Sequence, residues 1–360
     1  MKADRSLIPQ PLFTGVWGKN HIQGICVDQK KGYIYYSYTT TLVKATLDGR
    51  VVGSVTGLLG HLGCIALGDD GCVYGSLEYK MDGIGKGILE RLGTEASFEE
   101  GFYVVRFDTD RIDRMDIAAD GSDLMTAVYI REAVEDYNGF GKDKNGEQVS
   151  HRLGCSGIDG VTFAPLPGQT EAEGKYLYVA YGVYSELSRC DNDYQVLLCY
   201  DTAEWDRIAA PLKQNDMHKN GFAAPLHKFF VFTGNTNYGV QNLEYDRNTD
   251  SLYLSVYVGK KPEYPNFPLF AVDLSVSART EVLRGVGEEG EVLTLRTDGE
   301  CHEESGVCGY KFKLGATGMY SFGDGDWLFS DNRKCTDFHQ CAYIFKYRYV
   351  GGKDQFLLDV

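Results

Sequence analysis

GICVDQKKGYIYYSYTTTLVKATLDGRVVGSVTG, residues 24–57, holds four short apolar runs that are separated by polar or glycine-rich turns. Within these runs apolar and polar side chains alternate with a period of two, which is typical of β-strands. The turns QKKG and LDG are short enough to join neighbouring antiparallel strands. The stretch therefore predicts one four-stranded antiparallel sheet.

The same pattern recurs four more times along the chain. Each copy has a short apolar strand, an acidic or glycine-rich turn, a second strand rich in aromatic residues, and a third strand that ends in a charge. The first strands of the five copies begin near Gly24, Leu62, Gly157, Val240 and Ala316. Four antiparallel strands repeated around an axis make a β-propeller. We therefore predict an all-β propeller with five blades; six or seven are the alternatives, because residues 80–150 and 285–313 are long enough to hold a degenerate blade.

A propeller ring buries each blade against its neighbours, so we expect one domain over residues 1–360, with insertions at about 80–150 and 285–313. KGILERLGTEASFEEG, residues 86–101, is rich in helix formers and predicts a short helix over one face. Residues 125–148 join an amphipathic stretch to a polar loop. Long insertions often lie over a functional face, and decorative loops are the alternative.

The charge balance narrows the choice of partners. The 360 residues include 36 Lys and Arg against 51 Asp and Glu, which gives a formal net charge of −15. Affinity for nucleic acids comes mostly from cations on phosphates, and anionic membranes also attract basic surfaces. We therefore expect a small anionic or saccharide ligand, and neither a nucleic acid nor a membrane, as the partner.

The cysteines and the first residues bear on location. MKADRSLIPQPLF lacks the apolar run of a signal peptide, and no run in the chain approaches the length of a membrane helix. Ten cysteines without an export signal are most simply reduced thiols, which predicts a cytoplasmic protein. Cys26, Cys64, Cys72 and Cys199 fall in apolar strands, where cysteine acts as a small hydrophobic residue.

The topology of a propeller brings scattered residues to one funnel. The first strand of each blade starts, and the second ends, at the same face beside the central channel. Near the starts stand His21, Gln23, His61, His151, Asp159, Tyr238, Gln241 and Asn242. After the second strands stand Glu78, Tyr79, Lys80, Arg189, Lys260, Asp331 and Arg333.

Two histidines occupy equivalent positions in consecutive repeats, His21 in NHIQGI and His61 in GHLGCI. The repeat itself does not require a histidine there, so the pair indicates a functional role. The alternative is that both are polar caps at strand ends.

Cations also gather at this face, although the chain is acidic overall. They are Lys80, Arg189, Lys260, Lys261, Arg333 and Lys334. Cations that gather on one face of an acidic protein usually face an anion, and arginine suits a carboxylate or phosphate. The alternative is that they pair with Asp191, Asp193 and Asp331 nearby.

Histidine, tyrosine and cations beside an anion suit elimination at a uronate. We assign His21 or His61 as the general base, Tyr79 or Tyr238 as the acid, and Arg189 with Lys80 and Lys260 as the carboxylate clamp. The chain is similar in architecture and residue types to propeller-type carbohydrate-active enzymes, among them polysaccharide lyases. The resemblance is at class level, because no linear motif connects the chain to one family.

Paired carboxylates offer a second chemistry. Five-bladed glycosidases hold three acidic residues in the funnel, and here the candidates are Glu78, Asp159 and Asp331. The first repeat departs from that pattern, because it carries His21 and Gln23 where those enzymes carry an aspartate.

Metal ligands are a further possibility in this pattern. Asp159, Gln241 and Asn242 offer oxygen atoms for a Ca²⁺ in the central channel. ECHEESGVC and KCTDFHQC hold Cys301, His302, Cys308, Cys335, His339 and Cys341, at spacings looser than those of structural zinc. Disulfides are the alternative for these cysteines in an oxidising compartment.

The sequence thus predicts a carbohydrate-active enzyme, a lyase or a hydrolase, that acts on an acidic or polar saccharide at the propeller axis. A non-catalytic ligand- or protein-binding propeller is one alternative. A metal-dependent phosphoester or lactone hydrolase is the other. P-loop, Rossmann and GxSxG motifs are absent, which argues against nucleotide, dinucleotide and serine-hydrolase sites.

Overall fold

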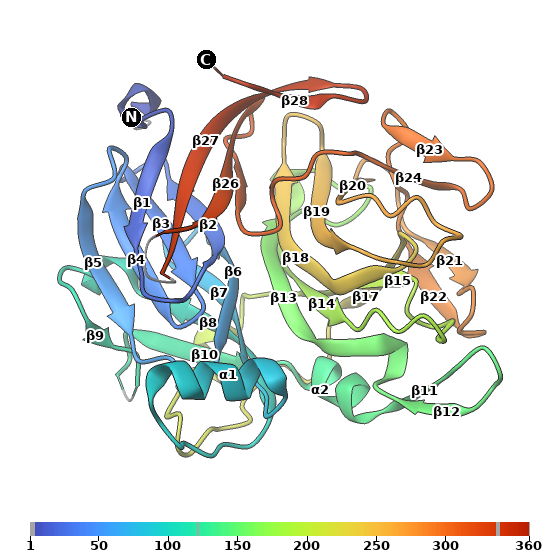
Figure 1. Cartoon of the computed structure of the whole chain (residues 1–360), viewed down its shortest axis with the longest axis horizontal. Coiled ribbons are helices and arrows are strands. Elements are labelled where there is room, and N and C mark those ends of the chain that lie inside the picture. The colour runs from blue at the N-terminus through green and yellow to red at the C-terminus, as the bar shows by residue number, and fades with distance from the viewer. Residues whose placement is uncertain (1–3, 121, 336–338, 360) are drawn as a thin grey trace.

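Five sheets of mainly antiparallel strands surround a central axis in the computed structural model, which describes residues 4–120, 122–335 and 339–359 (Figure 1). The innermost strand of each sheet packs against the innermost strands of its two neighbours, so the ring is closed. These inner strands are β2 (Ile22–Asp28), β6 (His61–Leu67), β13 (Cys155–Ala164), β18 (Thr236–Asp246) and β25 (Met319–Ser321). The predicted all-β propeller is confirmed, and it has five blades.

The remaining strands follow the inner strand of each blade outward. Blade 1 continues with β3 (Tyr33–Tyr38), β4 (Thr41–Thr46), β5 (Val51–Thr56) and β9 (Ile117–Ala118). Blade 2 continues with β7 (Val73–Tyr79), β8 (Gly101–Phe107), β10 (Met125–Tyr129) and β16 (Ala210–Pro211). Blade 3 continues with β14 (Tyr176–Val183), β15 (Tyr194–Tyr200), β17 (His227–Phe232), β22 (Glu289–Val292) and β21 (Arg279–Val282).

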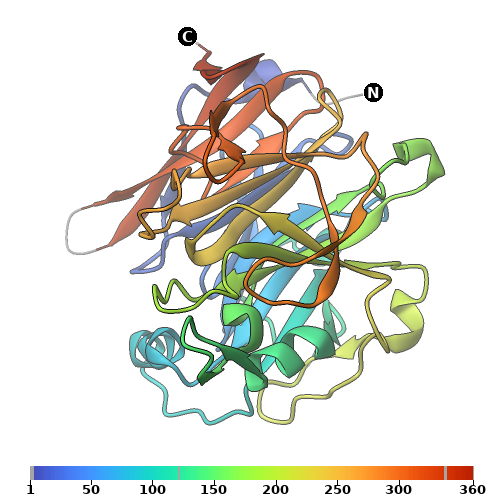
Figure 2. The same ribbon diagram turned by 90° about the vertical axis from the view of Figure 1, so that its right-hand side faces the viewer.

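Blades 4 and 5 complete the ring. Blade 4 adds β19 (Ser251–Val258) and β20 (Leu269–Asp273) to β18. Blade 5 adds β26 (Asp326–Lys334), β27 (Gln340–Gly351), β28 (Gln355–Leu358) and β1 (Leu12–Val16). Because β1 comes from the beginning of the chain and pairs with β27, the two ends of the chain close the same blade. Both termini lie on the opposite side of the molecule from α1 (Gly83–Leu92) and α2 (Arg131–Asn138) (Figures 1 and 2).

Neither of the two long insertions forms a further blade. Residues 80–150 contain α1, α2 and β11 (Phe140–Lys142), which pairs with β12 (Gln148–Ser150), and they also supply β8, β9 and β10 to blades 1 and 2. Residues 285–313 supply β22 and the hairpin of β23 (Glu300–His302) and β24 (Val307–Gly309). The helix expected over residues 86–101 is present as α1, although it begins and ends earlier. A third short helix, α3 (Trp205–Ile208), follows β15.

Small residues allow the inner strands to approach one another. A Cβ atom on Gly24 of β2 would stand 2.8 Å from the backbone nitrogen of Ile65 in β6. Serines of the second strands join neighbouring blades: the Ser37 hydroxyl donates to the Gly63 carbonyl at 2.7 Å, and the Ser76 hydroxyl donates to the Asp159 carbonyl at 2.6 Å. These contacts fix the positions of β6 and β13, which carry much of the site described below.

The cysteines divide into two groups. Cys26, Cys64 and Cys199 are buried in the strands, as predicted, whereas Cys72 is only half-buried. Cys301 is joined to Cys308, and Cys335 to Cys341, by disulfides, so the expectation of ten reduced thiols is wrong for these four. Disulfides persist mainly in oxidising compartments, which removes the cysteine-based argument for a cytoplasmic location. Among the described residues, no helix combines the length and apolar character that a bilayer crossing requires.

Candidate active site

A cavity of about 440 Å³ lies at the axis, where four inner strands begin and four second strands end. We call this cavity the funnel. Helix α1 contributes Gly83, Ile84, Gly87 and Arg91 to its wall. The funnel brings together eight of the residues that the sequence singled out: His21, Gln23, His61, Glu78, Lys80, Asp159, Tyr238 and Gln241.

Glu78 and Lys80, at the end of β7, form a buried ion pair in the funnel wall. Lys80 Nζ lies 2.9 Å from Glu78 Oε2, and the two side chains are only 6% and 7% exposed. Lys80 Nζ also donates to the Ser156 carbonyl at 2.7 Å, while the backbone N–H of Ile158 donates to Glu78 Oε1 at 2.7 Å. Burial raises the pKa of Glu78, and the charge of Lys80 and these hydrogen bonds oppose that rise. We therefore assign Glu78 as the ionised carboxylate.

Asp159, on β13, is the second buried carboxyl group of the funnel. Its Oδ1 accepts one long hydrogen bond, 3.3 Å, from the backbone N–H of Cys64. Within the part of the chain that the structure describes, no Lys, Arg or His nitrogen forms an ion pair with it. Burial and then the negative charge of Glu78 raise the pKa of Asp159 well above its ordinary range. Because Lys80 neutralises Glu78, Asp159 is the carboxyl group of the two that keeps its proton.

Each of the two carboxyl groups depends on a glycine of a neighbouring blade. A Cβ atom on Gly63 of β6 would stand 1.9 Å from Asp159 Oδ1, and one on Gly157 of β13 would stand 1.9 Å from Glu78 Oε1. No side chain larger than hydrogen fits at such distances. The glycines in HLGCI and CSGID are thus explained by the carboxyl groups that they accommodate.

The two histidines lie beside this pair as neutral rings. Burial, followed by the charges of Lys80, His21 and Arg91, lowers the pKa of His61 to about 3. His61 Nδ1 lies 3.7 Å from Glu78 Oε2 and has no hydrogen-bond partner among the described residues. Burial and then Arg91 also lower the pKa of His21, whose Nε2 accepts a hydrogen bond from the Gln23 amide at 3.0 Å.

Helix α1 stands against the end of β7 because its first turn is shaped for that contact. The Asp82 carboxylate accepts hydrogen bonds from the backbone of Ile84 and Gly85, which caps the helix. A Cβ atom on Gly85 would stand 1.7 Å from the Lys80 carbonyl oxygen, so only glycine permits this approach. The helix thereby places Arg91 in the funnel wall.

Tyr238 and Tyr257 line the funnel from blade 4. Tyr238 adopts a positive φ of 64°, a strained conformation of the kind that gathers at functional sites. Burial and then the charge of Asp159 raise the pKa of Tyr257 to about 12.

Sequence reasoning missed Tyr257, although a signal for it exists. It stands two residues after a serine in SLYLSVY, as Glu78 does in YGSLE and Thr39 does in YYSYT, and all three line the funnel. Arg91 was also missed, because α1 lies outside the repeat and no repeated position points to it.

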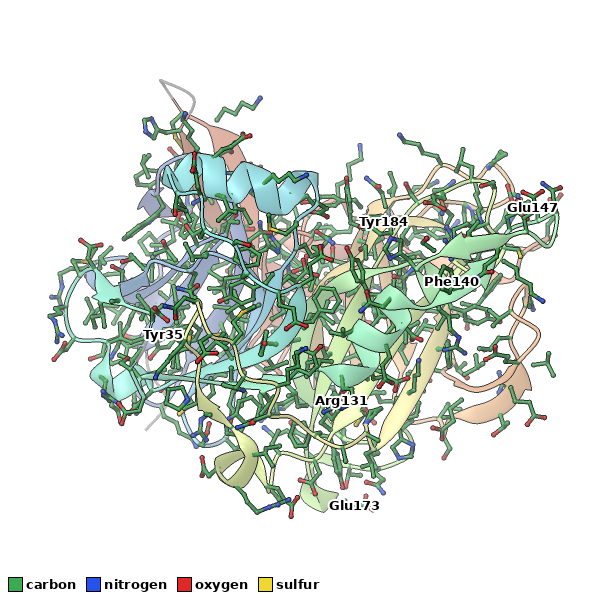
Figure 3. The ribbon with its side chains drawn as sticks, turned by 90° about the horizontal axis from the view of Figure 1, so that it is seen from below. Tyr35, Arg131, Phe140, Glu147, Glu173 and Tyr184 are labelled. Carbon is green, nitrogen blue, oxygen red and sulfur yellow. A yellow bond between two sulfur atoms is a disulfide. The ribbon has the colours of Figure 1, made fainter. Side chains whose placement is uncertain are left out.

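Several predicted residues lie outside the funnel wall. Tyr79, predicted as an acid, donates its hydroxyl to Gln214 Oε1 at 2.9 Å and packs between aromatic rings. His151 contacts the Tyr137 carbonyl through Nδ1 at 2.6 Å and packs against Tyr184, which Figure 3 labels.

The predicted clamp of cations is not present as such, because most of these residues pair with the nearby acids. Arg189 is buried and binds Asp191 at 2.9 Å, and Lys261 is buried and binds Asp193 at 2.5 Å. Arg333 binds Asp331 at 2.9 Å, and Lys260 and Lys334 are exposed. Lys80 is paired with Glu78 as described above. The cations that line the funnel without an ion pair in the described residues are Lys19 and Arg91.

Two of the three residues considered for Ca²⁺ hold backbone carbonyls through their amide nitrogens. The Asn242 amide nitrogen donates to the carbonyls of Gln23, at 2.8 Å, and Ala316, at 3.1 Å, and the Gln241 amide donates to the Tyr238 carbonyl at 2.9 Å. No group of three or more His, Cys, Asp or Glu side chains in the described ranges is arranged to hold a metal. The cysteines considered for zinc are the disulfide partners. We therefore derive no step through a metal.

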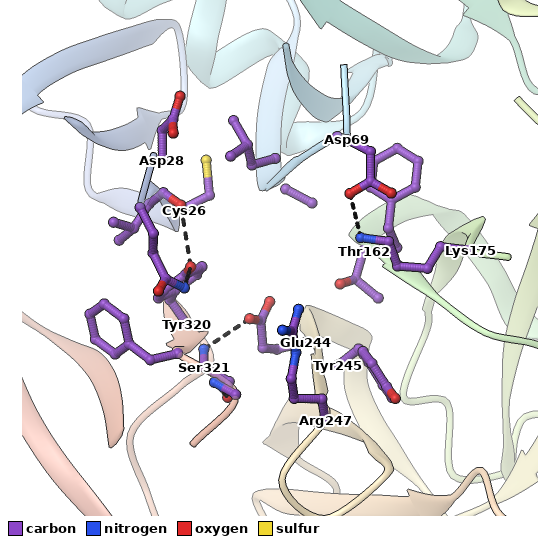
Figure 4. A pocket seen from close by; sticks show the side chains of 18 of the residues that line it. Cys26, Asp28, Asp69, Thr162, Lys175, Glu244, Tyr245, Arg247, Tyr320 and Ser321 are labelled. Carbon is purple, nitrogen blue, oxygen red and sulfur yellow. Dashed lines mark hydrogen bonds and ion pairs between the residues drawn. The ribbon is translucent and has the colours of Figure 1, made fainter. Parts of the chain in front are cut away.

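A second cavity, of about 370 Å³, lies at the opposite end of the axis, where β2, β6 and β18 end. We call it the opposite mouth. Figure 4 shows Glu244 there, with one carboxylate oxygen accepting a hydrogen bond from the backbone N–H of Ser321 at 2.8 Å. Burial raises the pKa of Glu244 well above its ordinary range.

No protein-family model and no curated protein matches the chain. Among solved structures, it is similar to a putative gluconolactonase, with a TM-score of 0.36 and 12% identity over 94% of this chain and 74% of that one. A glucose dehydrogenase has a TM-score of 0.37 and 11% identity, over 93% of this chain and 99% of that one. The calcium-binding protein regucalcin from Agrobacterium tumefaciens has a TM-score of 0.37 and 11% identity, over 96% and 95%. Likenesses this distant decide nothing about function.

Proposed function

We propose that this protein is an enzyme that hydrolyses a sugar-like substrate in the funnel by acid–base catalysis. The unequal pair of carboxyl groups carries this proposal. Glu78 is held as a carboxylate by Lys80, whereas Asp159 faces the same cavity without a cation and keeps a proton. Environments that separate the pKa values of two neighbouring carboxyl groups in this way make one of them the acid and the other the base.

The residues divide the hydrolysis between them. Asp159 donates its proton to the oxygen that leaves as the bond between carbon and oxygen breaks. Glu78 takes a proton from the water whose oxygen bonds to that carbon. Exchange with solvent then removes this proton from Glu78 and returns one to Asp159. His61, 3.7 Å from Glu78, is placed to hydrogen-bond this water or a substrate hydroxyl.

The wall of the funnel favours a substrate with hydroxyl groups and one anionic group. Neutral His21, Gln23 and Tyr238 offer donors and acceptors at close range. Lys19 and Arg91 supply positive charge that no acid in the described residues neutralises by an ion pair. An anion bound at Arg91 would also remove part of the repulsion that lowers the pKa of both histidines. A uronide or an acidic sugar lactone has this combination of groups.

The first experiment is an incubation with a panel of 4-nitrophenyl uronides, uronate oligosaccharides, acidic sugar lactones and their neutral counterparts. Reducing ends, acid release and the ultraviolet absorbance of an unsaturated uronate are followed together. Hydrolysis without that absorbance supports the proposal. A rise in absorbance would instead show elimination, and binding without turnover of any compound would show a ligand-binding propeller.

Selectivity for the anion is tested with Arg91→Gln. Loss of a charge-assisted hydrogen bond should reduce kcat/KM on an anionic substrate by roughly ten- to one-hundredfold, and should change the neutral counterpart much less. Lys86→Gln is the matched control, because Lys86 is an exposed cation of the same helix that does not line the funnel. Equal losses on the two substrates would contradict the assignment of Arg91.

A further inference from the structure

Gln23 stands at a β-bulge in the wall of the funnel. The pairing of β2 with β3 shifts its register between Ile22 and Gly24, so Gln23 has no partner of its own in the ladder. Bulges are frequent next to active sites, where they re-aim a side chain. The Asn242 amide fixes this bulge by donating to the Gln23 carbonyl at 2.8 Å. The side chain is 4% exposed and lines the cavity.

The two hydrogens of the Gln23 side-chain nitrogen both have acceptors. Its Nε2 lies 3.0 Å from His21 Nε2 and 3.3 Å from the hydroxyl oxygen of Thr39. An amide nitrogen only donates, so the ring nitrogen must be the acceptor in the first contact. A neutral imidazole has one accepting nitrogen and one N–H. The proton of a neutral His21 ring therefore lies on Nδ1.

The surroundings of His21 favour this neutral ring. Burial and then the charge of Arg91 lower its pKa, so the ring carries a single proton at neutral pH. Nδ1 has no hydrogen-bond partner among the described residues, and the ring lines the funnel. A histidine held by the protein through one nitrogen can use the other to bind a ligand that accepts a hydrogen bond.

Blade 2 carries the same histidine without such a glutamine. Two positions after His61 stands Gly63, the counterpart of Gln23. A Cβ atom on Gly63 would stand 1.9 Å from Asp159 Oδ1, so blade 2 has no room for a larger residue there. His61 Nδ1 has no partner in the described ranges. The glutamine of blade 1 is thus not a requirement of the repeat.

We propose that Gln23 is a positioning residue, which holds His21 as the Nδ1–H tautomer so that this N–H donates to an oxygen atom of the substrate. The proposal rests on the proposed function and gives His21 a place in it, because the ring then binds a hydroxyl or carboxylate oxygen. The lone pair of Nε2 is occupied by Gln23. His21 therefore cannot take a proton from the substrate, and the general-base role considered from the sequence does not go to it.

The tautomer is measured without any substrate, by ¹⁵N NMR on the whole chain labelled at its histidines. His21→Phe identifies the signals of His21 among those of the 7 histidines. At neutral pH, a long-range proton–nitrogen correlation should show a protonated Nδ1 and an unprotonated Nε2. An Nε2–H tautomer, or an average of the two tautomers, would overturn the proposal from the wild-type spectrum alone.

The cause of the tautomer is tested with Gln23→Leu, which removes the amide at a similar size and should shift His21 toward the Nε2–H form. Gln241→Leu is the matched control. Gln241 lies at a bulge of β18 and lines the funnel, but its amide donates to the Tyr238 carbonyl at 2.9 Å and not to a histidine. This control should leave the signals of His21 unchanged. Unchanged signals in Gln23→Leu as well would show that Gln23 does not set the tautomer.

A double-mutant cycle separates a positioning role from a direct one. On the substrate found in the panel, Gln23→Leu should reduce kcat/KM by roughly tenfold, the loss expected for one hydrogen bond. His21→Phe should reduce kcat/KM at least as much. Because Gln23 acts through His21, adding Gln23→Leu to His21→Phe should cost less than about twofold more.

Losses that multiply in the double variant would overturn the proposal, because Gln23 would then act on the substrate independently of His21. The two kinds of failure can be told apart. An absence of turnover throughout the panel would count against the proposed function, while the tautomer, measured on the free protein, would still decide the role of Gln23.

Discussion

The two ends of the central channel each hold a buried carboxyl group, and their surroundings differ. At the opposite mouth, the backbone N–H of Ser321 donates to Glu244 at 2.8 Å, and the Ser321 hydroxyl donates to Asp246 at 2.6 Å (Figure 4). Three of the four cations that line that mouth pair with acids, whereas Lys30 forms no ion pair in the described residues. Lys175 lies 2.5 Å from Asp69. Arg247 and Lys31 pair likewise with acids of their own.

In the funnel, several polar groups lack strong hydrogen bonds or ion pairs with the described residues. Asp159 accepts only a 3.3 Å hydrogen bond, and His61 Nδ1 has no partner in the described residues. Arg91 makes no ion pair there either, in the ranges that the structure describes. Buried polar groups are ordinarily satisfied, so unsatisfied ones that face a cavity indicate a missing ligand. Both carboxyl groups are buried and each accepts one backbone hydrogen bond, so the contrast lies in the longer bond to Asp159 and in the unpartnered groups beside it.

The difference between the two carboxyl groups is tested most directly by replacing each of them by its amide. Asp159→Asn and Glu244→Gln both resemble the protonated side chain, so neither should change the free energy of unfolding at neutral pH by more than about 1 kcal/mol. Asp159→Asn removes the proton donor and should reduce kcat by roughly 10²- to 10⁴-fold on the substrate found in the panel. Glu244→Gln should keep activity within twofold.

Steady-state kinetics and chemical denaturation of the two variants measure both quantities. Full activity of Asp159→Asn would show that the funnel carboxyl group is as structural as Glu244. An equal loss in both variants would point to a shared effect on the channel instead of chemistry at one end.

The ion pairs of the two ends provide the second comparison. Lys80→Met removes one partner of a pair that is 6% and 7% exposed, and leaves Glu78 buried without its cation. We expect a loss of about 3–5 kcal/mol in the free energy of unfolding. Lys175→Met breaks a pair whose Asp69 side chain is 77% exposed, and should cost about 0–1 kcal/mol. Urea denaturation of both variants tests this, and equal losses would show that Lys80 and Glu78 are not coupled in the buried state.

The period-two alternation and the repeated turns sufficed to predict the five inner strands, because these patterns are local. The placement of His21, His61, Glu78 and Asp159 in one funnel followed from blade topology alone. The role of cations could not be predicted in the same way. Charge counts do not show which acid a side chain reaches. Arg189 was therefore predicted to bind an anionic ligand, whereas in the structure it binds Asp191.

Two further features depend on contacts between distant segments. The position of α1 rests on Gly85 meeting the Lys80 carbonyl, a fit that helix propensity does not reveal. Tyr79 and Tyr238 looked equivalent as acids in the sequence, but alternation along β7 turns Tyr79 away from the funnel toward Gln214. A shift of one position along a strand reverses the face, which is why adjacent residues are hard to assign without exact register.

The glycine next to Asp159 gives a third test. Gly63→Ala would bring a methyl group within 1.9 Å of Asp159 Oδ1, so either the carboxyl group or β6 must move. Overpacking of this kind typically costs about 1–3 kcal/mol, and the displaced acid should lower kcat as well. Gly83→Ala is the control for adding a methyl group in the stability measurement, because a Cβ atom there meets nothing within 4 Å; it lines the funnel, so its kcat is not used as a reference. If Gly63→Ala kept both stability and kcat, the close packing of Asp159 would not matter for catalysis.

The last test concerns the neutral histidine. The pKa of His61 is lowered to about 3 in the folded protein, mainly by burial, against about 6.5 in an unfolded chain. Between these values the unfolded state binds more protons, so this residue's contribution to stability is present above pH 6.5 and is lost as the pH falls toward 3. The difference in unfolding free energy between wild type and His61→Gln should change by up to about 1.4 kcal/mol per pH unit in that window. His302→Gln, in the β23–β24 hairpin outside the funnel, controls for the loss of a histidine. If the free energies of unfolding of wild type and His61→Gln changed in parallel with pH, solvent or an acid would reach the ring. The polar groups of the funnel would then be as well hydrogen-bonded as those of the opposite mouth.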